Sequence, residues 1–493
     1  MISKSTTMQK KQGNPFSNAL KAQPWAPHPY QKKALKFLLG HGGAGLFLDP
    51  GLGKTSIGLA GLKVLKKEGM LRAALIVAPL RVCFSVWPKE IKKWADFNGL
   101  TYVILHGKNK EELLEEKADI YLINPEGLQW LMDEEHLKRF KKLNVCTLIV
   151  DESSKFKKTS TQRFKILKPY LPKFKRRWIF TGSPAPNGLM DLFGQVYILD
   201  LGRALSPYIT HYRKNFFTPS GFGGYEWKII PGAEERINKL IKPLVLRLDA
   251  KDYLELPQIV TNNIVVQLPP IARKIYDAME KEMIATLEGG KSSMAVSAAS
   301  ASMKCRQIAS GGVYHDTFED DDPMPSKKLW THVHDAKTEA IEDLIGEMQG
   351  RPILIGYEFK HDLDRLQKLL GKNVPYIGGG VSTKRSTEIE ELWNADKLPV
   401  LLGQPQSMGH GLNLQGSECN TVAWYSPTWN YELYDQFIKR VARQGSKHKR
   451  IFVHHIIAEN TTDEAVIYSI KGKHKTQKDF LDALRTYVRA KEE

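Results

Sequence analysis

The sequence predicts an α/β protein of two tandem lobes, each with a parallel sheet flanked by helices, joined by a mainly helical insertion. The chain has 493 residues, too many for one hydrophobic core, since a domain usually holds about 100–200 residues. Short apolar runs alternate with amphipathic segments in two separate series, which is typical of βαβ units. The composition, with 42% hydrophobic and 26% charged residues, is that of a chain that folds.

The first lobe fills residues 26–215, after a polar segment of residues 1–25 that we expect to be flexible. Its first element is a helix, because apolar residues recur at helical spacing over 29–39. In such sheets, ligands bind beyond the carboxyl ends of the strands. Apolar runs that end in Gly, Pro, Asp or Ser predict these strands at 44–49, 73–80, 101–107, 119–125, 146–152 and 176–184.

The rhythm of strands and helices is lost in the middle of the chain, so residues 216–335 are predicted to be an insertion and linker. Segments 236–248 and 271–290 have a helical pattern. Segment 289–302 is small and polar and 318–323 is a run of acids, so we expect both to be loops. The second lobe is predicted at residues 336–493, because this part of the chain holds a further series of apolar runs. They lie at 351–358, 374–379, 398–404, 420–426 and 450–457.

The charge of the chain favours a nucleic-acid partner. Lysine and arginine number 72 against 54 acids, a formal charge of +18, and such a surplus attracts polyanions by counterion release. A generally basic protein with no such partner is the alternative. The four cysteines are dispersed, without a zinc-binding spacing. No apolar stretch resembles a signal peptide or a membrane span. We expect a protein of the cytoplasm of a bacterial or virus-infected cell, or of the nucleus if eukaryotic, with no membrane partner.

The strongest local signal is LFLDPGLGKTS, an apolar run followed by Gly51, Gly53, Lys54, Thr55 and Ser56. Glycines let backbone N–H groups close around phosphates, and the amino end of the following helix favours their charge. Lys54 is placed to reach the outer phosphates and Thr55 to ligate magnesium. A leucine stands where the full GxxxxGK[ST] pattern has its first glycine, and a glycine-rich turn without a ligand is the alternative.

Two acids follow another predicted strand, in CTLIVDESS. Asp151 would hold Mg2+, directly or through water, and Glu152 would polarise the attacking water as general base. Such a pair is often plain surface, but its occurrence together with GLGKT favours a nucleotide site. Thr181 and Ser183, in TGSP at the next strand exit, are candidates to couple the carboxylates to the second lobe, although a Gly–Pro turn explains them equally well.

Near the carboxyl end, QFIKRVARQG places Gln436, Arg440 and Arg443 at i, i+4 and i+7, which is one face of a helix. One or both arginines are candidates to stabilise charge on a transferring phosphoryl group. A solvated basic helix face is the alternative.

Five motifs, taken in order along the chain, resemble those of superfamily 2 helicases and, within them, the Swi/Snf-type ATPases. They are GLGKT, DESS, TGSP, SMGHGLNLQ and QFIKRVARQG. The stretches 244–258, 303–312 and 334–345 resemble linker signatures of that family, and the resemblance covers roughly residues 25–470. It implies tandem RecA-like lobes, an ATP-binding lobe and a helicase C-terminal lobe, that hydrolyse ATP with Mg2+.

The resemblance also implies residue roles. Gln31 matches the glutamine that contacts adenine, and Gly409, Gly411 and Asn413 match a second-lobe motif beside ATP. Gln436 and the two arginines match the finger motif. Ser154 stands where the family has a histidine, which puts the strength of coupling in question.

The function that this resemblance implies is a DNA-dependent ATPase motor that translocates on duplex or forked DNA, in fork remodelling, recombination or repair. A strand-separating DNA or RNA helicase, a nuclease-associated motor subunit and a non-catalytic nucleic-acid-binding scaffold remain alternatives. The sequence identifies no protein partner.

Overall fold

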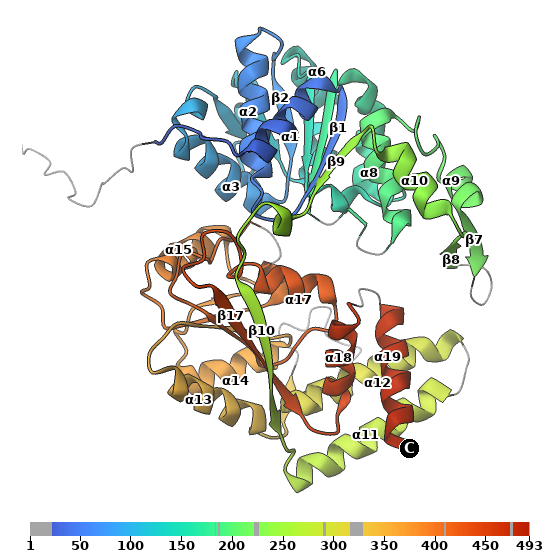
Figure 1. Cartoon of the computed structure of the whole chain (residues 1–493), viewed down its shortest axis with the longest axis vertical. Coiled ribbons are helices and arrows are strands. Elements are labelled where there is room, and N and C mark those ends of the chain that lie inside the picture. Colours follow the sequence, from blue (N-terminus) through green and yellow to red (C-terminus); the bar gives the residue numbers. More distant parts are fainter. Residues whose placement is uncertain are drawn as a thin grey trace, which may run out of the picture.

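The computed structural model describes residues 22–182, 184–185, 188–220, 226–288, 292–315, 329–408, 411–473 and 477–492. These residues form two lobes stacked along the long axis of the molecule (Figure 1). The expectations for Ser183, Gly409 and the acid run at 318–323 concern residues outside these ranges.

The first lobe is built on a seven-stranded sheet in which every neighbouring pair is parallel, in the order β3-β4-β2-β5-β6-β1-β9. Both faces are buried, because Leu148 and Val150 of β5 pack in one core and Ile149 in the other. Burial on two sides explains why these strands are continuous apolar runs. The strands are β1 (Gly43–Leu48), β2 (Ala74–Val77), β3 (Tyr102–Ile104), β4 (Ile120–Ile123), β5 (Thr147–Asp151), β6 (Arg176–Thr181) and β9 (Val245–Leu248).

Helices lie on both faces of this sheet, as expected for βαβ units. A hairpin, β7 (Phe217–Ser220) with β8 (Glu226–Ile229), projects from the side of the lobe next to two of these helices (Figure 1). The helices are α1 (Pro29–Gly40), α2 (Lys54–Lys67), α3 (Leu80–Lys93), α4 (Lys110–Glu115), α5 (Leu128–Leu131), α6 (Glu134–Lys142), α7 (Gln162–Leu167), α8 (Leu192–Asp200), α9 (Ile209–Phe216) and α10 (Ala233–Ile241).

The second lobe has a six-stranded sheet, again parallel throughout, in the order β10-β17-β16-β13-β15-β14. Its strands are β10 (Gln258–Val266), β13 (Ile353–Gly356), β14 (Tyr376–Ile377), β15 (Val400–Gly403), β16 (Thr421–Trp424) and β17 (Arg450–Ala458). A short antiparallel pair, β11 (Gly312–Tyr314) and β12 (Trp330–His332), stands apart from the sheet. The helices are α11 (Pro270–Glu288), α12 (Ser292–Ser310), α13 (Ala336–Met348), α14 (Lys360–Leu370), α15 (Thr383–Asn394), α16 (Pro405–Met408), α17 (Tyr431–Ile438), α18 (Thr462–Lys471) and α19 (Gln477–Glu492).

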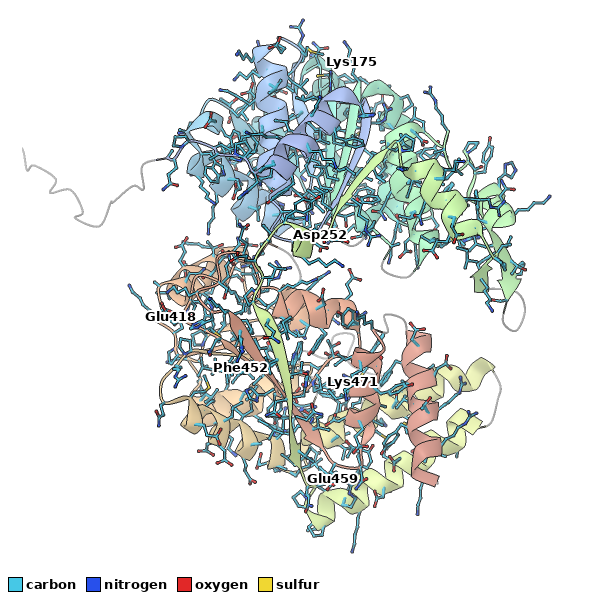
Figure 2. The ribbon with its side chains drawn as sticks, in the orientation of Figure 1. Lys175, Asp252, Glu418, Phe452, Glu459 and Lys471 are labelled. Atoms are coloured by element: carbon cyan, nitrogen blue, oxygen red, sulfur yellow. The ribbon has the colours of Figure 1, made fainter. Side chains whose placement is uncertain are left out.

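The middle of the chain contributes a strand to each sheet. The segment expected to be helical over 236–248 ends its helix, α10, at Ile241 and continues as β9. Pro243 explains the break, since proline has no N–H for a helix hydrogen bond and its ring clashes with the preceding turn. After β9 the chain crosses to β10 through the turn η7 (Ala250–Asp252), and Asp252 lies between the lobes (Figure 2).

The expectation of a loop over 289–302 was wrong where the structure describes it. Helix α12 begins at Ser292 and runs beside α11 (Figure 1). The alanine-rich sequence has high helix propensity, and Ala301 and Cys305 are buried in the second-lobe core with Tyr276 of α11. Tertiary packing therefore stabilises a helix in a segment whose small, polar composition predicted a loop. Among the described residues, no helix is both long and apolar enough to cross a membrane.

Candidate active site

Three neighbouring strands of the first lobe bring the predicted site residues together. The phosphate-loop sequence follows β1, Asp151 is the last residue of β5, and Thr181 is the last residue of β6. Strand β6 lies between β5 and β1 in the sheet. Because the strands are parallel, their carboxyl ends meet at the same edge of the sheet. The loops that the sequence singled out separately are therefore adjacent in space.

The glycines of the phosphate loop have the backbone geometry that its sequence predicts. Gly51 and Gly53 have φ values of 96° and 78°, in the left-handed region that only glycine adopts easily. Helix α2 begins at Lys54, so its first N–H groups face the loop. A Cβ at Gly53 would lie 2.5 Å from the Gln31 side-chain nitrogen, so a larger residue would displace Gln31. Ser56 donates a hydrogen bond to the Gly53 carbonyl (2.9 Å), which fixes the first turn.

Lys54, Asp151 and Glu152 form a cluster of opposite charges, in which Asp151 is buried and the other two are half-buried. Burial lowers the pKa of Lys54, and the charges of Glu152 and Asp151 oppose that shift. Burial, and next the negative charge of Glu152, raise the pKa of Asp151, while Lys54 opposes this. The Lys54 ammonium donates to the Leu48 carbonyl at 2.7 Å. A cation bound by Asp151 would lower the cost of keeping this acid ionised.

The backbone at Glu152 is strained in a way that is common at functional sites. Its φ of 53° is unusual for a residue with a side chain. The Glu152 amide donates to Asp151 Oδ1 (3.0 Å), which orients the neighbouring carboxylate. Sequence patterns predict the two acids but not this turn.

Trp87 is a residue of the site that the sequence analysis missed. It is fully buried in α3, and its indole nitrogen donates a hydrogen bond to Asp151 Oδ2 at 3.0 Å. The bond links the acid to a helix 64 positions away in the chain. The only signal in the sequence was a tryptophan within an amphipathic helix, and such residues usually serve packing alone.

Gln31, expected to contact adenine, holds the phosphate loop. Its side-chain nitrogen donates to the Leu52 carbonyl (3.3 Å), and its side-chain oxygen accepts from the His28 amide (2.9 Å). Next to it, the rings of Tyr30 and Tyr253 lie 5.0 Å apart. Gln31 is thus adjacent to the phosphate loop. Besides the expected contact with adenine, these two bonds explain why a glutamine occupies this position.

Thr181 is fully buried beside the phosphate loop. The following Gly182 allows that approach, since a Cβ there would lie 3.1 Å from the Pro50 ring. Pro184, in the same loop, is tied to the acidic loop by Gln195 of α8, which the sequence analysis did not single out. Gln195 accepts a hydrogen bond from the Ser153 hydroxyl (2.8 Å) and donates to the Pro184 carbonyl.

Gln195 has no exposed surface and lies in the middle of a mainly apolar helix, LFGQVYILD. A polar side chain in such a helix must find buried hydrogen-bond partners. That was the available signal in the sequence.

From the second lobe, Arg443 approaches the phosphate loop. Its guanidinium lies 3.7 Å from the position that a Cβ at Gly51 would take. Arg443 also donates to Asn413 Oδ1 at 2.7 Å, so the two predicted residues hold each other. Burial lowers the pKa of Arg443, yet an arginine remains charged at neutral pH.

Arg440 occupies a different environment. It is buried and donates to the carbonyls of Leu412 and Gln436, each at 3.1 Å. Burial, and next the charge of Arg443, lower its pKa to about 10. Arg440 therefore braces the loop that carries Asn413, and Arg443 lies beside the phosphate loop of the first lobe.

The expectation of one helical face for Gln436, Arg440 and Arg443 was wrong. Helix α17 ends at Ile438, and the following residues form turns. The Arg440 carbonyl accepts from the Leu414 amide (3.1 Å), a bond to another loop that replaces the continuation of the helix. Gln436 remains in the helix, where its side chain donates to Glu432 (3.1 Å).

The two lobes also touch beside the site, through α3 and α15. Arg81 and Lys89 of α3 lie 3.7 and 4.0 Å from the carboxylate of Glu390. Gly411, with φ of 74°, packs against α3, since a Cβ there would lie 3.4 Å from Val82 and from Val86. Helix α3 thus contacts both the buried acid Asp151, through Trp87, and the second lobe.

Two family models match this chain. The SNF2-related domain matches residues 30–310, and the helicase conserved C-terminal domain matches residues 336–445. The first match alone covers more than half of the chain. The chain belongs to the SNF2-type ATPases of helicase superfamily 2. It is therefore an ATP-binding and ATP-hydrolysing enzyme of that superfamily.

The curated relatives of this SNF2-type ATPase include proteins of very different length. Protein p41 of Acyrthosiphon pisum secondary endosymbiont phage 1 is 33% identical over 94% of this chain and 99% of its own. An ATP-dependent helicase of Mycoplasma pneumoniae is 25% identical over 89% of this chain and 40% of its own. The DNA repair and recombination protein RAD54-like of Gallus gallus is 22% identical over 89% and 65%. The chain thus spans less than two thirds of the latter two relatives.

Among solved structures, the chain is similar to the Sulfolobus solfataricus SWI2/SNF2 ATPase core in complex with dsDNA. The identity is 23% and the TM-score is 0.43, with 93% of each chain covered.

Proposed function

We propose that this SNF2-type ATPase is a DNA-dependent motor that translocates on double-stranded DNA and serves fork remodelling, recombination or repair. The observation that carries the proposal is the approach of Arg443, in the second lobe, to the phosphate loop of the first. A site shared between two lobes lets nucleotide binding draw them together and product release separate them. Such lobe motion is a way to step along a polymer.

We propose that the first lobe binds ATP with Mg2+. Lys54 and the amide groups at the start of α2 hold the phosphates, and Thr55 and Asp151 hold the cation. The bound cation neutralises charge on the phosphate oxygens. The raised pKa of Asp151 is consistent with a site built to hold a positive charge.

The remaining roles belong to residues around the phosphates. Glu152 orients and deprotonates the attacking water, and Arg443 stabilises charge that develops on the transferring phosphoryl group. Gln195 joins the acidic loop to the Thr181 loop, so it is placed to couple hydrolysis to lobe movement.

DNA is proposed as the track for two reasons. The formal charge of +18 favours a polyanion. Relatives that align along most of this chain are named as a DNA repair and recombination protein and as a chromatin remodeling factor. Binding to DNA should therefore weaken steeply with salt, and a flat response would contradict tracking along the phosphate backbone.

The test is steady-state ATP hydrolysis with duplex, forked and single-stranded DNA, with RNA, and without polymer. We expect duplex or forked DNA to stimulate turnover, and Lys54→Ala and Glu152→Gln to abolish it while DNA binding persists. Arg443→Ala should lower the rate by about 10³–10⁵-fold. Arg351→Ala, an exposed arginine of the same lobe, is the matched control and should not.

Displacement of a third strand from a triplex, without separation of the underlying duplex, would demonstrate translocation. Stimulation by single strands or RNA alone would instead indicate a strand-separating helicase. No hydrolysis with any polymer would indicate a non-catalytic scaffold.

A further inference from the structure

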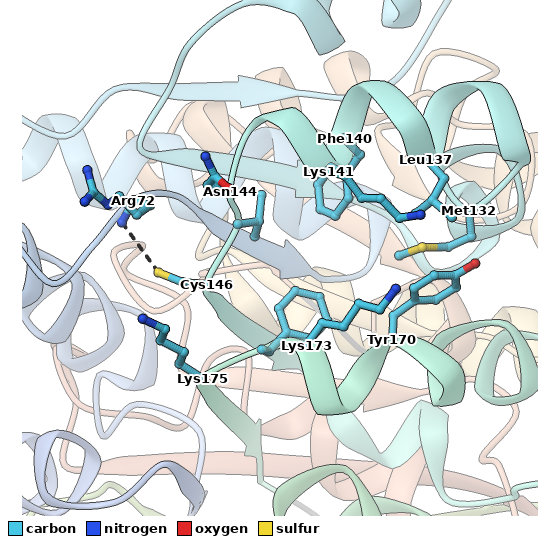
Figure 3. Close-up of a pocket in the computed structure, with 12 residues that line it drawn as sticks. Arg72, Met132, Leu137, Phe140, Lys141, Asn144, Cys146, Tyr170, Lys173 and Lys175 are labelled. Atoms are coloured by element: carbon cyan, nitrogen blue, oxygen red, sulfur yellow. Dashed lines mark hydrogen bonds between the residues drawn. The ribbon is translucent and has the colours of Figure 1, made fainter.

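A cavity of about 630 Å³ lies in the first lobe, at the edge of the sheet opposite the nucleotide site (Figure 3). Three of its residues mark the amino ends of strands. Lys175 directly precedes β6, and Arg72 and Val145 lie two residues before β2 and β5. Asp151 and Thr181 mark the carboxyl ends. Figure 2 accordingly shows Lys175 at the end of the first lobe that is remote from Asp252 and the second lobe.

The floor of this cavity is apolar and its rim is cationic. Phe140 and Phe174 are buried, and Met132 is half-buried beside them. The complete lining is Arg72, Met132, Leu137, Phe140, Lys141, Asn144, Val145, Cys146, Tyr170, Lys173, Phe174 and Lys175. Four cations and no carboxylate therefore line the cavity. All four cations are exposed.

Among the residues that the structure describes, none of these four cations forms an ion pair with an acid, whereas their neighbours do. On the same helix, Lys138 pairs with Glu134 at 2.9 Å and Arg139 pairs with Glu135 at 2.7 Å. Lys141, which faces the cavity, has no such ion pair within the part of the chain that the structure describes. Figure 3 shows Lys141 and Lys173 extended in the same direction, toward Met132 and Tyr170.

We propose that this cavity binds a short acidic peptide segment of a partner protein, with one bulky apolar side chain at its centre. The apolar side chain enters the cavity and contacts Met132, Phe140 and Phe174. Flanking carboxylates pair with Lys141 and Lys173 at the rim. The charged side chains of the lining are all cationic, so they complement a negatively charged ligand. The cavity volume is within the range of ordinary ligand pockets, about 300–1,000 Å³.

A peptide fits this chemistry better than nucleic acid does. Specific recognition of a base uses hydrogen-bond partners on its edges. In this lining Asn144 is the uncharged amide, and the other side chains are apolar, phenolic, thiol or cationic. A flexible methionine beside aromatic rings accommodates an aliphatic or aromatic side chain instead. The location leaves the nucleotide site unobstructed while a partner is bound, so the cavity is suited to recruitment.

The test uses the full chain and a fluorescein-labelled eight-residue peptide, a central phenylalanine flanked by aspartates, followed by fluorescence anisotropy. We expect the Lys141→Glu/Lys173→Glu double variant to weaken binding by at least about tenfold, since it replaces two attractions by two repulsions. Lys142→Glu changes an exposed lysine of the same helix that does not line the cavity. This matched control should bind the peptide within about twofold of the unaltered chain.

Two further measurements separate the peptide from other anions. Met132→Ser should weaken the phenylalanine peptide, and replacement of the phenylalanine by serine in the peptide should have a similar effect. A short oligothymidylate is the nucleic-acid probe. Circular dichroism melts check that each variant is folded.

The proposal is overturned if the peptide does not bind, or if the double variant binds it as well as the control does. It is also overturned if the oligothymidylate, and not the peptide, loses affinity in the double variant, because the cavity would then be a nucleic-acid contact. These outcomes are independent of ATP hydrolysis.

Discussion

Substitution of Trp87 by phenylalanine tests whether the indole hydrogen bond sets the charge state of Asp151. Phenylalanine keeps an aromatic ring in the first-lobe core and removes the single N–H that reaches Asp151 Oδ2 at 3.0 Å. The acid remains buried, and its carboxylate then has one donor fewer. The expected consequence is a weaker magnesium site.

The magnitude follows from the strength of a hydrogen bond to a charged group, about 1.5–3 kcal/mol. Loss of that bond destabilises the ionised form, so the pKa of Asp151, already raised by burial, should rise by about one to two further units. Loss of a residue that orients a metal ligand usually weakens metal binding by about 10–100-fold, and we expect this change for the cation at Asp151.

The assay is ATP hydrolysis as a function of magnesium concentration, repeated across pH. We expect the half-saturating magnesium concentration to rise by about 10–100-fold. The acid limb of the pH profile should move to higher pH, because a higher pKa requires a higher pH to ionise the acid. Trp94→Phe is the matched control, since Trp94 directly follows α3 and donates to Glu90 (2.7 Å), away from the site.

An unchanged magnesium requirement in a folded Trp87→Phe protein would refute this reasoning. An equal shift in Trp94→Phe would also refute it, because a general loosening of α3 would then explain both results.

Three other predictions concern coupling, lobe contact and stability. Gln195→Met should leave the Ser153 hydroxyl without its acceptor and lower the free energy of unfolding, measured in urea, by about 1–3 kcal/mol. DNA-stimulated ATP hydrolysis should fall more than basal hydrolysis, and equal losses would contradict a coupling role. Glu390→Gln removes the negative charge that pairs with Arg81 and Lys89 of the other lobe, so single-molecule energy transfer between the lobes should report longer distances, and an unchanged distribution would argue against the contact. Burial lowers the pKa of His334 and of His455 to about 4, below the value of about 6.5 in the unfolded chain. The free energy of unfolding should therefore fall by about 1.4 kcal/mol per histidine as the pH drops from 8 to 5.5, and an unchanged value over this range would contradict the prediction.

The phosphate loop and the strands around it were predictable because their signals are local. Glycine is the residue that tolerates a positive φ at little cost, so Gly51 and Gly53 indicate the loop without reference to the rest of the chain. Strands buried on both faces are apolar throughout, which sets them apart from amphipathic helices. The family resemblance rested on these same short motifs.

The helix α12 was not predictable in this way. Its serines and alanines are typical of a polar loop as well as of a helix that packs closely, and burial of Ala301 and Cys305 against α11 distinguishes the two. The end of α17 at Ile438 has a similar cause, because the Arg440 carbonyl bonds to an amide in another loop.

The sequence by itself determined the two lobes, the family and the identity of the residues at the phosphate loop, because each depends on residue type and short spacing. Only the tertiary structure decided that Trp87 orients Asp151, that Gln195 joins two loops, that Arg443 lies beside the phosphate loop, and that Arg440 holds the loop at Leu412. Hydrogen bonds between side chains distant in sequence leave no periodicity, since their geometry arises only when the sheets bring the strand ends together.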